Sequence, residues 1–227
     1  MKRILLLLLL LLIIYLFSRR ETFITKQDST IVYYINLDHR LDRKQQILDE
    51  IKKLELPDDK IVRIPGIYNK EQGLVGCSKS HIRALETFID SGLDNCIIFE
   101  DDFQFLHEPK EQIENFFKQE VPYDVVMLSN NGGNITSSGY PGIQRINNTQ
   151  TASGYIVSKQ FAPTLLQNLK EGGQLLEQDY SNAHTYANDQ YWKRLQPISN
   201  WFVFDPKLGT QRESFSDIQG GVVNYGV

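Results

Sequence analysis

The sequence predicts an α/β fold, with one globular domain behind a hydrophobic leader. A short apolar run at 31–35 precedes a segment, 47–54, with apolar residues at helical spacing, and a second short run follows at 61–64. The two runs are rich in β-branched residues, as is typical of strands, while apolar residues three and four positions apart indicate an amphipathic helix. Strand, helix and strand in this order form a βαβ unit.

A third short apolar run, at 96–99 after Asn95, ends abruptly in Glu100, Asp101 and Asp102. The run predicts a buried strand with the acids at its carboxyl end, where ligands bind in open α/β sheets. Three neighbouring carboxylates repel one another unless a cationic group lies among them, and oxygen ligands suit Mg²⁺ or Mn²⁺ better than zinc. The alternative is an acidic turn that is solvated and inert.

The rest of the chain continues the alternation of strands and helices. A helix is expected after a flexible, glycine-rich lead-in at 73–78, with Gly92 as its cap and with one apolar face made of Ile82, Leu85, Phe88 and Ile89. Further expected elements are strands at 125–128, 152–157 and 201–204, a helix around 161–169, and an exposed loop at 130–142. No repeat or internal boundary is evident, so residues 27–227 are expected to form a single domain.

Length and composition exclude some classes of protein. The chain has 227 residues with 41% apolar and 23% charged, which fits one domain with a sizeable core. Its formal charge is −4, and four of its basic residues flank the hydrophobic N-terminus, so the body is more acidic still. Such a body lacks the basic surface that binds nucleic acid, and we expect no nucleic-acid partner.

Two cysteines do not make a disulfide framework. Cys96 lies in the predicted buried strand and is expected in the core. Cys77 precedes a predicted helix, where a thiol can be activated, although two structural thiols are the alternative.

Residues 1–26 are expected to be a leader and a short stalk. Fourteen apolar residues at 4–17 would form a helix about 21 Å long, short of a roughly 30 Å hydrocarbon core, which favours a signal peptide. The small residues of a cleavage site are missing, so we prefer an uncleaved signal anchor. Sequons at Asn134 and Asn147 agree with a luminal domain. If the protein is eukaryotic or viral, we expect it to be anchored to a membrane of the secretory pathway, in the lumen of the ER or Golgi. If the leader is cleaved, we expect it to be secreted.

Four segments taken in order resemble glycosyltransferase family 25, which includes lipooligosaccharide galactosyltransferases and collagen hydroxylysine galactosyltransferases. They are residues 35–43 (INLDHRLDR), 76–81 (GCSKSH), 98–102 (IFEDD), and Gln211 with 216–218 (SDI). The similarity runs from about Ile31 to Gly220. It implies a GT-A-like, Rossmann-type single domain that binds a nucleotide sugar, with an acceptor region on the C-terminal side.

The resemblance also implies a divalent metal, Mn²⁺ or Mg²⁺, in the place of the family's D-x-D element. By this analogy Asp102 ligates the metal, while Glu100 holds the ribose or the metal and its water shell. A nucleotide diphosphate leaves with negative charge, which a bound divalent ion stabilises as a Lewis acid.

Asn36, Arg40 and Arg43 follow the first strand, where the family binds the nucleotide, and arginines there can pair with phosphate oxygens. The alternative is that these arginines pair with Asp38 or Asp42 at the surface.

Ser80 and His81 are expected to open a helix, whose N-terminus attracts anions such as phosphate. The alternative for His81 is a side chain satisfied by hydrogen bonds near the start of the helix.

An inverting transfer needs a base for the acceptor hydroxyl. Asp189 is the first candidate, because Tyr191 and Trp192 beside it could stack on a sugar, and Asp217 is the second. Aromatic residues next to an acid are also common in cores, so a structural role is the alternative. Many GT-A enzymes complete the metal shell with a C-terminal histidine, whereas the last histidine here is His184.

The resemblance predicts an enzyme that moves galactose or glucose from its UDP form to a glycan or hydroxylated acceptor. Two alternatives stay open: a non-catalytic carbohydrate- or nucleotide-binding relative of the same fold, and a metal-dependent phosphoesterase. A phosphoesterase would need further His or Asp ligands for a second metal, and the sequence shows no such cluster.

Overall fold

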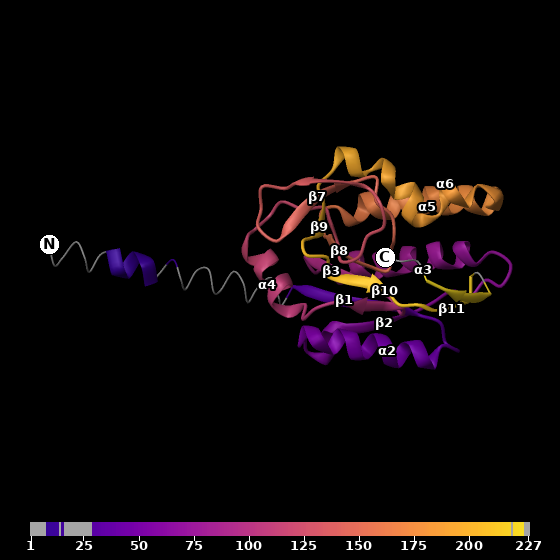
Figure 1. Cartoon of the computed structure of the whole chain (residues 1–227), viewed down its shortest axis with the longest axis horizontal. Helices are drawn as coiled ribbons and strands as arrows, with labels where there is room; N and C mark the ends of the chain where they lie inside the picture. Colours follow the sequence, from indigo (N-terminus) through magenta and orange to yellow (C-terminus); the bar gives the residue numbers. More distant parts are fainter. Residues whose placement is uncertain (1–7, 14, 16–28, 219, 225–227) are drawn as a thin grey trace.

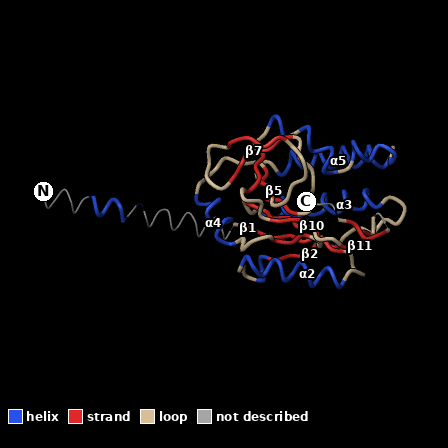
Figure 2. The backbone as a smooth tube through the Cα atoms, viewed as in Figure 1, coloured by secondary structure: helices blue, strands red, loops and turns tan. Residues whose placement is uncertain are grey.

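The structure is a computed structural model that describes residues 8–13, 15, 29–218 and 220–224. A mixed eight-stranded sheet lies at the centre of the domain, and helices cover both of its faces (Figures 1 and 2). α3 and α5 lie together on one face, and α2 lies on the other. The expected α/β class is confirmed.

The strands are β1 Thr30–Asn36, β2 Ile61–Pro65, β3 Asn95–Glu100, β4 Phe103–Phe105, β5 Val125–Met127, β6 Asn134–Ser137, β7 Ile143–Asn147, β8 Gly154–Ser158, β9 Trp201–Phe204, β10 Gly209–Gln211, β11 Ser214–Ser216 and β12 Gly221–Val223. The α-helices are α2 Leu41–Ile51, α3 Gly73–Ser91, α4 Lys110–Lys118, α5 Ala162–Gln178, α6 Ala183–Tyr186 and α7 Asn188–Tyr191. Short 3₁₀ turns occupy Lys52–Leu54, Asp58–Lys60, Tyr180–Asn182, Trp192–Arg194 and Gln196–Ile198.

The large sheet has the strand order β2-β1-β3-β8-β5-β9-β7-β6. β1 runs parallel to both β2 and β3, as the predicted βαβ unit requires. β8 pairs antiparallel with β3 and with β5, and β7 pairs antiparallel with β9 and β6. The parallel strands β1 and β3 therefore end at the same edge of the sheet, which places Asn36 and the acid turn side by side.

Two hydrophobic cores fill the space between the sheet and its helices. Alternate residues of β1 point to opposite faces, so that Tyr33 packs under α3 and α5 while Val32 packs with α2 and α4. Ile47 and Ile51 of α2 are fully buried, which confirms the apolar face expected there. A strand buried on both faces explains why β1 and β3 are continuous apolar runs in the sequence.

The predicted strands and helices are present, with three corrections in detail. Residues 73–78 are not a flexible lead-in but the first turns of α3. Gly76 serves close packing there, because a Cβ at that position would overlap the carbonyl oxygen of Ile67. The expected loop at 130–142 contains β6, whose side chains are exposed, and Ile89 lies on the exposed side of α3.

Phe103 joins the acid turn to the rest of the fold. It follows Asp102 directly, is fully buried, and packs against Phe99 and Phe105 with ring centroids 4.7 and 4.8 Å away. Its ring lies against Gly154 of β8 and Gly209 of β10, where a Cβ would overlap it. Two glycines on strands far away in the sequence therefore make the room that this ring needs.

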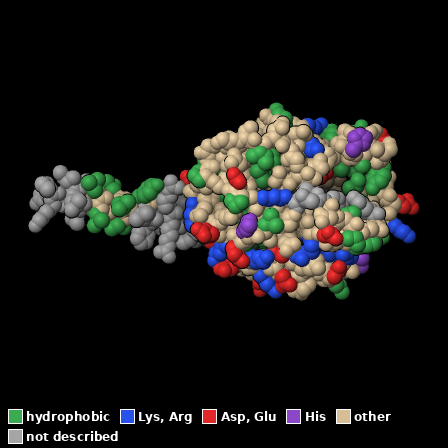
Figure 3. Space-filling view, viewed as in Figure 1, with side chains coloured by type: hydrophobic (Ala, Val, Ile, Leu, Met, Phe, Trp, Pro, Cys, Tyr) green, Lys and Arg blue, Asp and Glu red, His purple; other side chains and the backbone are tan. Residues whose placement is uncertain are grey.

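The predicted leader lies largely outside the described residues. In the part of the chain that the structure does describe, no helix is both long and apolar enough to cross a membrane. Charged side chains of both signs lie interspersed along the lower part of the domain in the view of Figure 3.

Candidate active site

A cleft opens where the carboxyl ends of β1, β2 and β3 meet, as the sequence predicted for the acids. Its cavity volume is about 130 Å³. Its walls include the end of β1, the start of α3, the acid turn and the C-terminal segment. The predicted site residues among its lining are Asn36, Arg43, Ser80, Glu100, Asp102 and Asp217.

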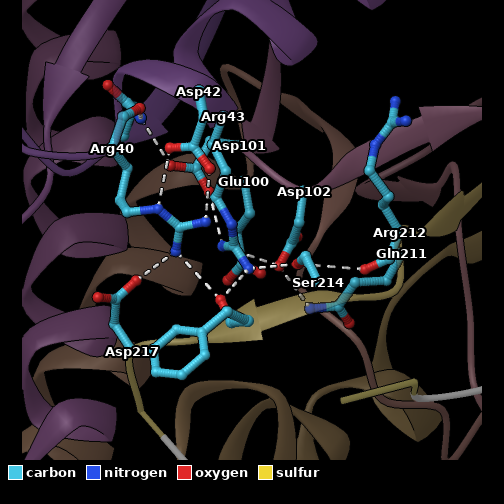
Figure 4. A network of polar contacts seen from close by, with 12 residues as sticks. Arg40, Asp42, Arg43, Glu100, Asp101, Asp102, Gln211, Arg212, Ser214 and Asp217 are labelled. Atoms are coloured by element: carbon cyan, nitrogen blue, oxygen red, sulfur yellow. Dashed lines mark hydrogen bonds and ion pairs between the residues drawn. The ribbon is translucent and has the colours of Figure 1, made fainter. Parts of the chain in front are cut away.

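Arg43 is the cationic group among the acids. Its Nη1 lies 2.9 Å from Asp101 Oδ1 and 3.2 Å from Asp102 Oδ2, and its side chain is buried (Figure 4). Asn36 Nδ2 donates to the other oxygen of Asp101 at 2.7 Å. Asp101 is therefore fully engaged in holding the turn, and one guanidinium offsets the charge of three carboxylates only in part.

Asp102 has one oxygen committed and one without a partner. Oδ2 accepts from Gln211 Nε2 at 3.1 Å and faces Arg43, whereas Oδ1 is buried and has no hydrogen-bond partner among the described residues. Burial, and after it the charge of Glu100, raise the pKa of Asp102 to about 7 against the lowering by Arg43. A buried, unpaired carboxylate oxygen next to a second carboxylate fits a divalent cation with oxygen ligands.

Glu100 is held from behind by His81. His81 Nε2 lies 2.9 Å from Glu100 Oε1, and its Nδ1 lies 3.0 Å from the hydroxyl of Tyr155 on β8. Burial raises the pKa of Glu100, but the hydrogen bond and charge of His81 outweigh it and hold that pKa below its ordinary value. Glu100 thus stays ionised at the cleft.

Ser80 and His81 do not open a helix, because they are the eighth and ninth residues of α3. Ser80 Oγ donates to the carbonyl of Gly76 and accepts from the backbone N–H of Ile67. The expected phosphate contact at a helix N-terminus therefore has no basis in the fold. His81 is a buried side chain with hydrogen bonds at both ring nitrogens, as the alternative expects, but it lies in the middle of α3 and not near its start.

Arg40 belongs to a second ionic group at the mouth of the cleft. Its Nη1 lies 2.6 Å from Asp217 Oδ2 and donates to the carbonyl of Phe215, while its Nε and Nη2 pair with Asp42. Burial raises the pKa of Asp217, but the hydrogen bonds from His39 and Arg40 outweigh it and lower that pKa.

The surface pairing proposed as the alternative holds for Arg40 with Asp42 only. Arg43 pairs with Asp101 and Asp102, and the partner of Asp38 is Arg63. The sequence did not identify the distant partners, which are Asp101 for Arg43, 58 residues away, and Asp217 for Arg40, 177 residues away.

The C-terminal segment, residues 211–218, covers one side of the cleft. Arg212 N donates to the carbonyl of Asp102 at 2.7 Å, and Arg43 Nη2 donates to Ser214 Oγ and to the carbonyl of Phe215. Gln211, Ser216, Asp217 and Ile218 all line the cleft. Both arginines after β1 are thus bound to this segment.

Asp189 lies deeper, beside the acid cluster rather than on the lining of the cleft. Its Oδ2 accepts from the backbone N–H of Thr151 at 3.0 Å. Burial raises its pKa, the Thr151 contact opposes this, and the charge of Glu100 adds to the rise. The raised pKa agrees with a base, whereas the bond to Thr151 agrees with the structural alternative.

The aromatic side chains next to Asp189 do not form a sugar platform. Trp192 is fully buried, donates its Nε1–H to the carbonyl of Thr149, and packs against Tyr155 and Trp201. Tyr191 carries the guanidinium of Arg194 over its ring at 4.2 Å. The expected stacking is wrong because both rings face other protein groups.

Sequence reasoning missed two groups that the fold brings to the cleft. Cys77 lies at the lining rather than before a helix, with Sγ 3.5 Å from Glu100 Oε1. Burial raises the pKa of its thiol well above the ordinary value, and Glu100 raises it further, so helix activation of this thiol is wrong. Tyr68, half exposed after β2, is the second group. The helical spacing of Cys77 and His81 in the sequence was a usable signal for the first.

Comparison with known proteins agrees with this geometry. Residues 68–139 match the family described as glycosyltransferase family 25 (LPS biosynthesis protein). The matched segment contains α3 and the acid turn, which carry two of the four motifs. The resemblance to glycosyltransferase family 25 is therefore confirmed, and it supports a glycosyltransferase. No curated protein sequence matches the chain.

Solved structures with a similar course of the chain have little sequence identity. A197 from STIV has a TM-score of 0.50 at 12% identity, over 86% of this chain and 92% of that one, which shows a shared fold alone. Mannose-1-phosphate geranyltransferase from Thermus thermophilus gives 0.49 at 9% identity, over 78% and 73% of the two chains. A glycosyltransferase involved in the glycosylation of the major capsid of PBCV-1 gives 0.46 at 14%, over 78% and 82%. The likeness to the last two is too weak to carry a conclusion.

Proposed function

We propose that this chain, which carries a glycosyltransferase family 25 segment around its acid turn, is a metal-dependent hexosyltransferase. The donor is a UDP-sugar with galactose or glucose, and the acceptor is a glycan or a hydroxylated protein. The transfer inverts the anomeric centre. One observation carries the proposal: Asn36, Arg43, Asp102 and Gln211, which come from three separate motifs, meet in one cleft at the carboxyl ends of β1 and β3.

Asp102 is the residue that would hold the divalent cation. Its Oδ1 is buried and unpaired while Arg43 and Gln211 hold Oδ2, so one oxygen is fixed in position and the other is left to bind. A divalent ion bound there would stabilise the charge of the diphosphate leaving group. Glu100 lies beside it as an ionised acceptor for the ribose hydroxyls or the water around the ion.

Arg40 and Arg43 would bind the diphosphate. Both guanidinium groups already contact anions or carbonyls at the cleft, which is the geometry that phosphate oxygens require. Arg40 now pairs with Asp217, so a phosphate would take the place of that carboxylate.

The cleft is too small for a whole nucleotide sugar in its present form. Sites for ligands of this size usually have roughly 300–1,000 Å³, whereas this cavity has about 130 Å³. The C-terminal segment forms one of the walls, through contacts that a diphosphate would replace. We therefore expect this segment to move outward when donor binds.

Asp189 remains the first candidate for the base, and Asp217 the second. The raised pKa of Asp189 favours proton uptake, and the lowered pKa of Asp217, paired with Arg40 and His39, disfavours it. Acceptor would approach from the side of α7, opposite the nucleotide.

A donor screen tests the proposal. Purified protein with Mn²⁺ and a panel of UDP-sugars should release UDP from one hexose donor, measured by a coupled assay, and release should stop with EDTA. Absence of release and of transfer with every donor, in protein shown to be folded, would contradict an enzyme.

The same screen separates the alternatives. A non-catalytic relative would bind UDP in calorimetry without releasing it from any donor. A phosphoesterase would hydrolyse a simple aryl phosphate with no acceptor present. The match of residues 68–139 to a glycosyltransferase family supports transfer instead. We therefore favour transfer.

We also propose that residues 1–26 anchor the enzyme to a membrane of the secretory pathway, with the domain in the lumen. The proposal depends on the fourteen apolar residues and the missing cleavage site. Expressed in a secretory system, the protein should stay in the membrane fraction after alkaline carbonate extraction. A soluble product starting near Glu21 would show cleavage instead.

A further inference from the structure

Three side chains of different chemistry meet at the back wall of the cleft. Cys77 and His81 stand four residues apart on α3, and Glu100 ends β3. One ligand atom of each, the sulfur, an imidazole nitrogen and a carboxylate oxygen, lies within 4.8 Å of the others. Of the three residues, only Glu100 is also expected at the oxygen site of Asp102.

The distances fit a tetrahedral zinc site. Glu100 Oε1 lies 2.9 Å from His81 Nε2 and 3.5 Å from Cys77 Sγ. With Zn–S of about 2.3 Å and Zn–N and Zn–O of about 2.1 Å, a tetrahedron has edges of roughly 3.4 Å between N and O and roughly 3.6 Å between S and O. The nitrogen–oxygen pair must open by about half an ångström, and the sulfur and nitrogen, which lie within 4.8 Å of each other, must stand roughly 3.6 Å apart.

The surroundings supply what such a site needs. The hydroxyl of Tyr155 lies 3.0 Å from His81 Nδ1 and can accept a hydrogen bond from Nδ1–H, which leaves Nε2 without a proton and free for a metal. His81 is buried, so its ring has one orientation. Cys77 and Glu100 line the cleft, which leaves the fourth position open to it.

We propose that Cys77, His81 and Glu100 form a Zn²⁺ site, separate from the oxygen site of Asp102 except for Glu100. A sulfur, nitrogen and oxygen set selects Zn²⁺ over Mg²⁺ and Mn²⁺. On binding, the thiol releases its proton to solvent, and the imidazole proton passes to Nδ1, which donates to Tyr155. Zinc at this site draws Glu100 away from the donor, so zinc and the nucleotide compete for one carboxylate.

Cobalt substitution tests the site without any assay of transfer. Full-length protein titrated with Co²⁺ alone should show a thiolate-to-cobalt charge-transfer band that saturates at one equivalent and is displaced by Zn²⁺. In Cys77→Ser the band should vanish, and the affinity for Zn²⁺ in calorimetry should fall at least about 100-fold, because a thiolate ligand is lost. In Tyr155→Phe it should fall about 10- to 100-fold, as when a partner of a ligating histidine is removed.

Two control variants show whether the cobalt band comes from the proposed site. Cys96→Ala removes the other cysteine, which is buried in the core, and should leave the band unchanged. Asp102→Asn removes the oxygen site and should also leave it unchanged, so the zinc site is tested even if the proposed transfer fails. A folded protein without the band, or a band that survives in Cys77→Ser, would overturn the proposal.

Discussion

The cleft has an inner wall, formed by the acid turn, and an outer wall, formed by the C-terminal segment. Each wall pairs an arginine with an aspartate, but the pKa values of the two aspartates shift in opposite directions. On the inner wall Arg43 faces Asp102, deep in the fold, and the pKa of that acid is raised. On the outer wall Arg40 faces Asp217 near the surface, and the pKa of that acid is lowered. Burial is the largest influence on both acids and raises both pKa values, but only on the outer wall do the partners outweigh it.

The difference separates a fixed wall from one that can move. The inner acids lie on a turn between two strands and are held by side chains from β1, α2 and β10. The outer acid lies on a segment tied mainly by ion pairs and backbone contacts to Arg40 and Arg43. Partly exposed ion pairs contribute little to stability, so the outer wall is the one that donor binding can displace.

Asp189→Asn should give the largest change, a loss of turnover, because it removes the proposed base. Turnover should fall about 10²–10⁴-fold while UDP-sugar affinity stays nearly the same. The amide oxygen of the variant can still accept from Thr151 N, so the fold should survive. Steady-state kinetics with calorimetry measure both values.

Asp217→Asn is the matched control for that role. If it abolishes turnover while Asp189→Asn retains it, the two acids exchange roles. If both variants bind donor poorly, neither acid is the base.

Asp102→Asn should weaken Mn²⁺-dependent UDP binding at least about 100-fold, since the inner wall loses its unpaired carboxylate oxygen and one charge. Binding of UDP without metal should hardly change, which serves as the internal control. Calorimetry that shows the same Mn²⁺-dependent affinity in both proteins would rule out Asp102 as a metal ligand.

The dependence of folding stability on pH should also reveal the inner wall, through the raised pKa of Asp102. The pKa of Asp102 is raised from 3.8 to about 7, so between these values the folded state binds more protons than the unfolded state. Stability contributed by this group is therefore present at low pH and is lost as pH rises through the window. Each pKa unit corresponds to about 1.4 kcal/mol, so the loss amounts to a few kcal/mol at most.

Melting temperatures in EDTA measure this effect. Wild type should lose stability relative to Asp102→Asn as the pH rises through that window, because the variant has no proton to release. Parallel curves of melting temperature against pH for the two proteins would show that Asp102 does not have the raised pKa.

The smallest effect is expected on the outer wall. Asp217→Asn should loosen the C-terminal segment and raise UDP affinity about two- to fivefold, consistent with an ion pair worth up to about 1 kcal/mol. Asp42→Asn removes another partner of Arg40 without touching the segment, and it should change affinity less. Tighter binding in Asp42→Asn than in Asp217→Asn would mean that the segment is not the barrier.

The sequence predicted the inner wall better than the outer wall for a physical reason. β1 and β3 are buried on both faces, so each is an unbroken apolar run, and the acids stand out at the end of one of them. The contacts of Arg43 with Asp101 and Ser214 join segments 58 and 171 residues apart, and nothing local in the sequence encodes them.

Local patterns misled where packing decided the outcome. The glycines at 73–76 suggested flexibility, but Gly76 is required by the close approach of Ile67 to α3. Trp192 beside an acid suggested a sugar platform, but the fold uses its ring as core. In both cases the residue type was informative only once its three-dimensional neighbour was known.

The ring of Phe103 makes the acid turn sensitive to substitutions that never touch it. Gly154 and Gly209 belong to different sheets, and each leaves the volume that this ring occupies. A methyl group at either position would displace the ring, and with it the adjoining backbone of Asp102. Two residues without side chains thus help to fix the position of the acid turn, and substitutions at them would alter the site although neither glycine is part of it.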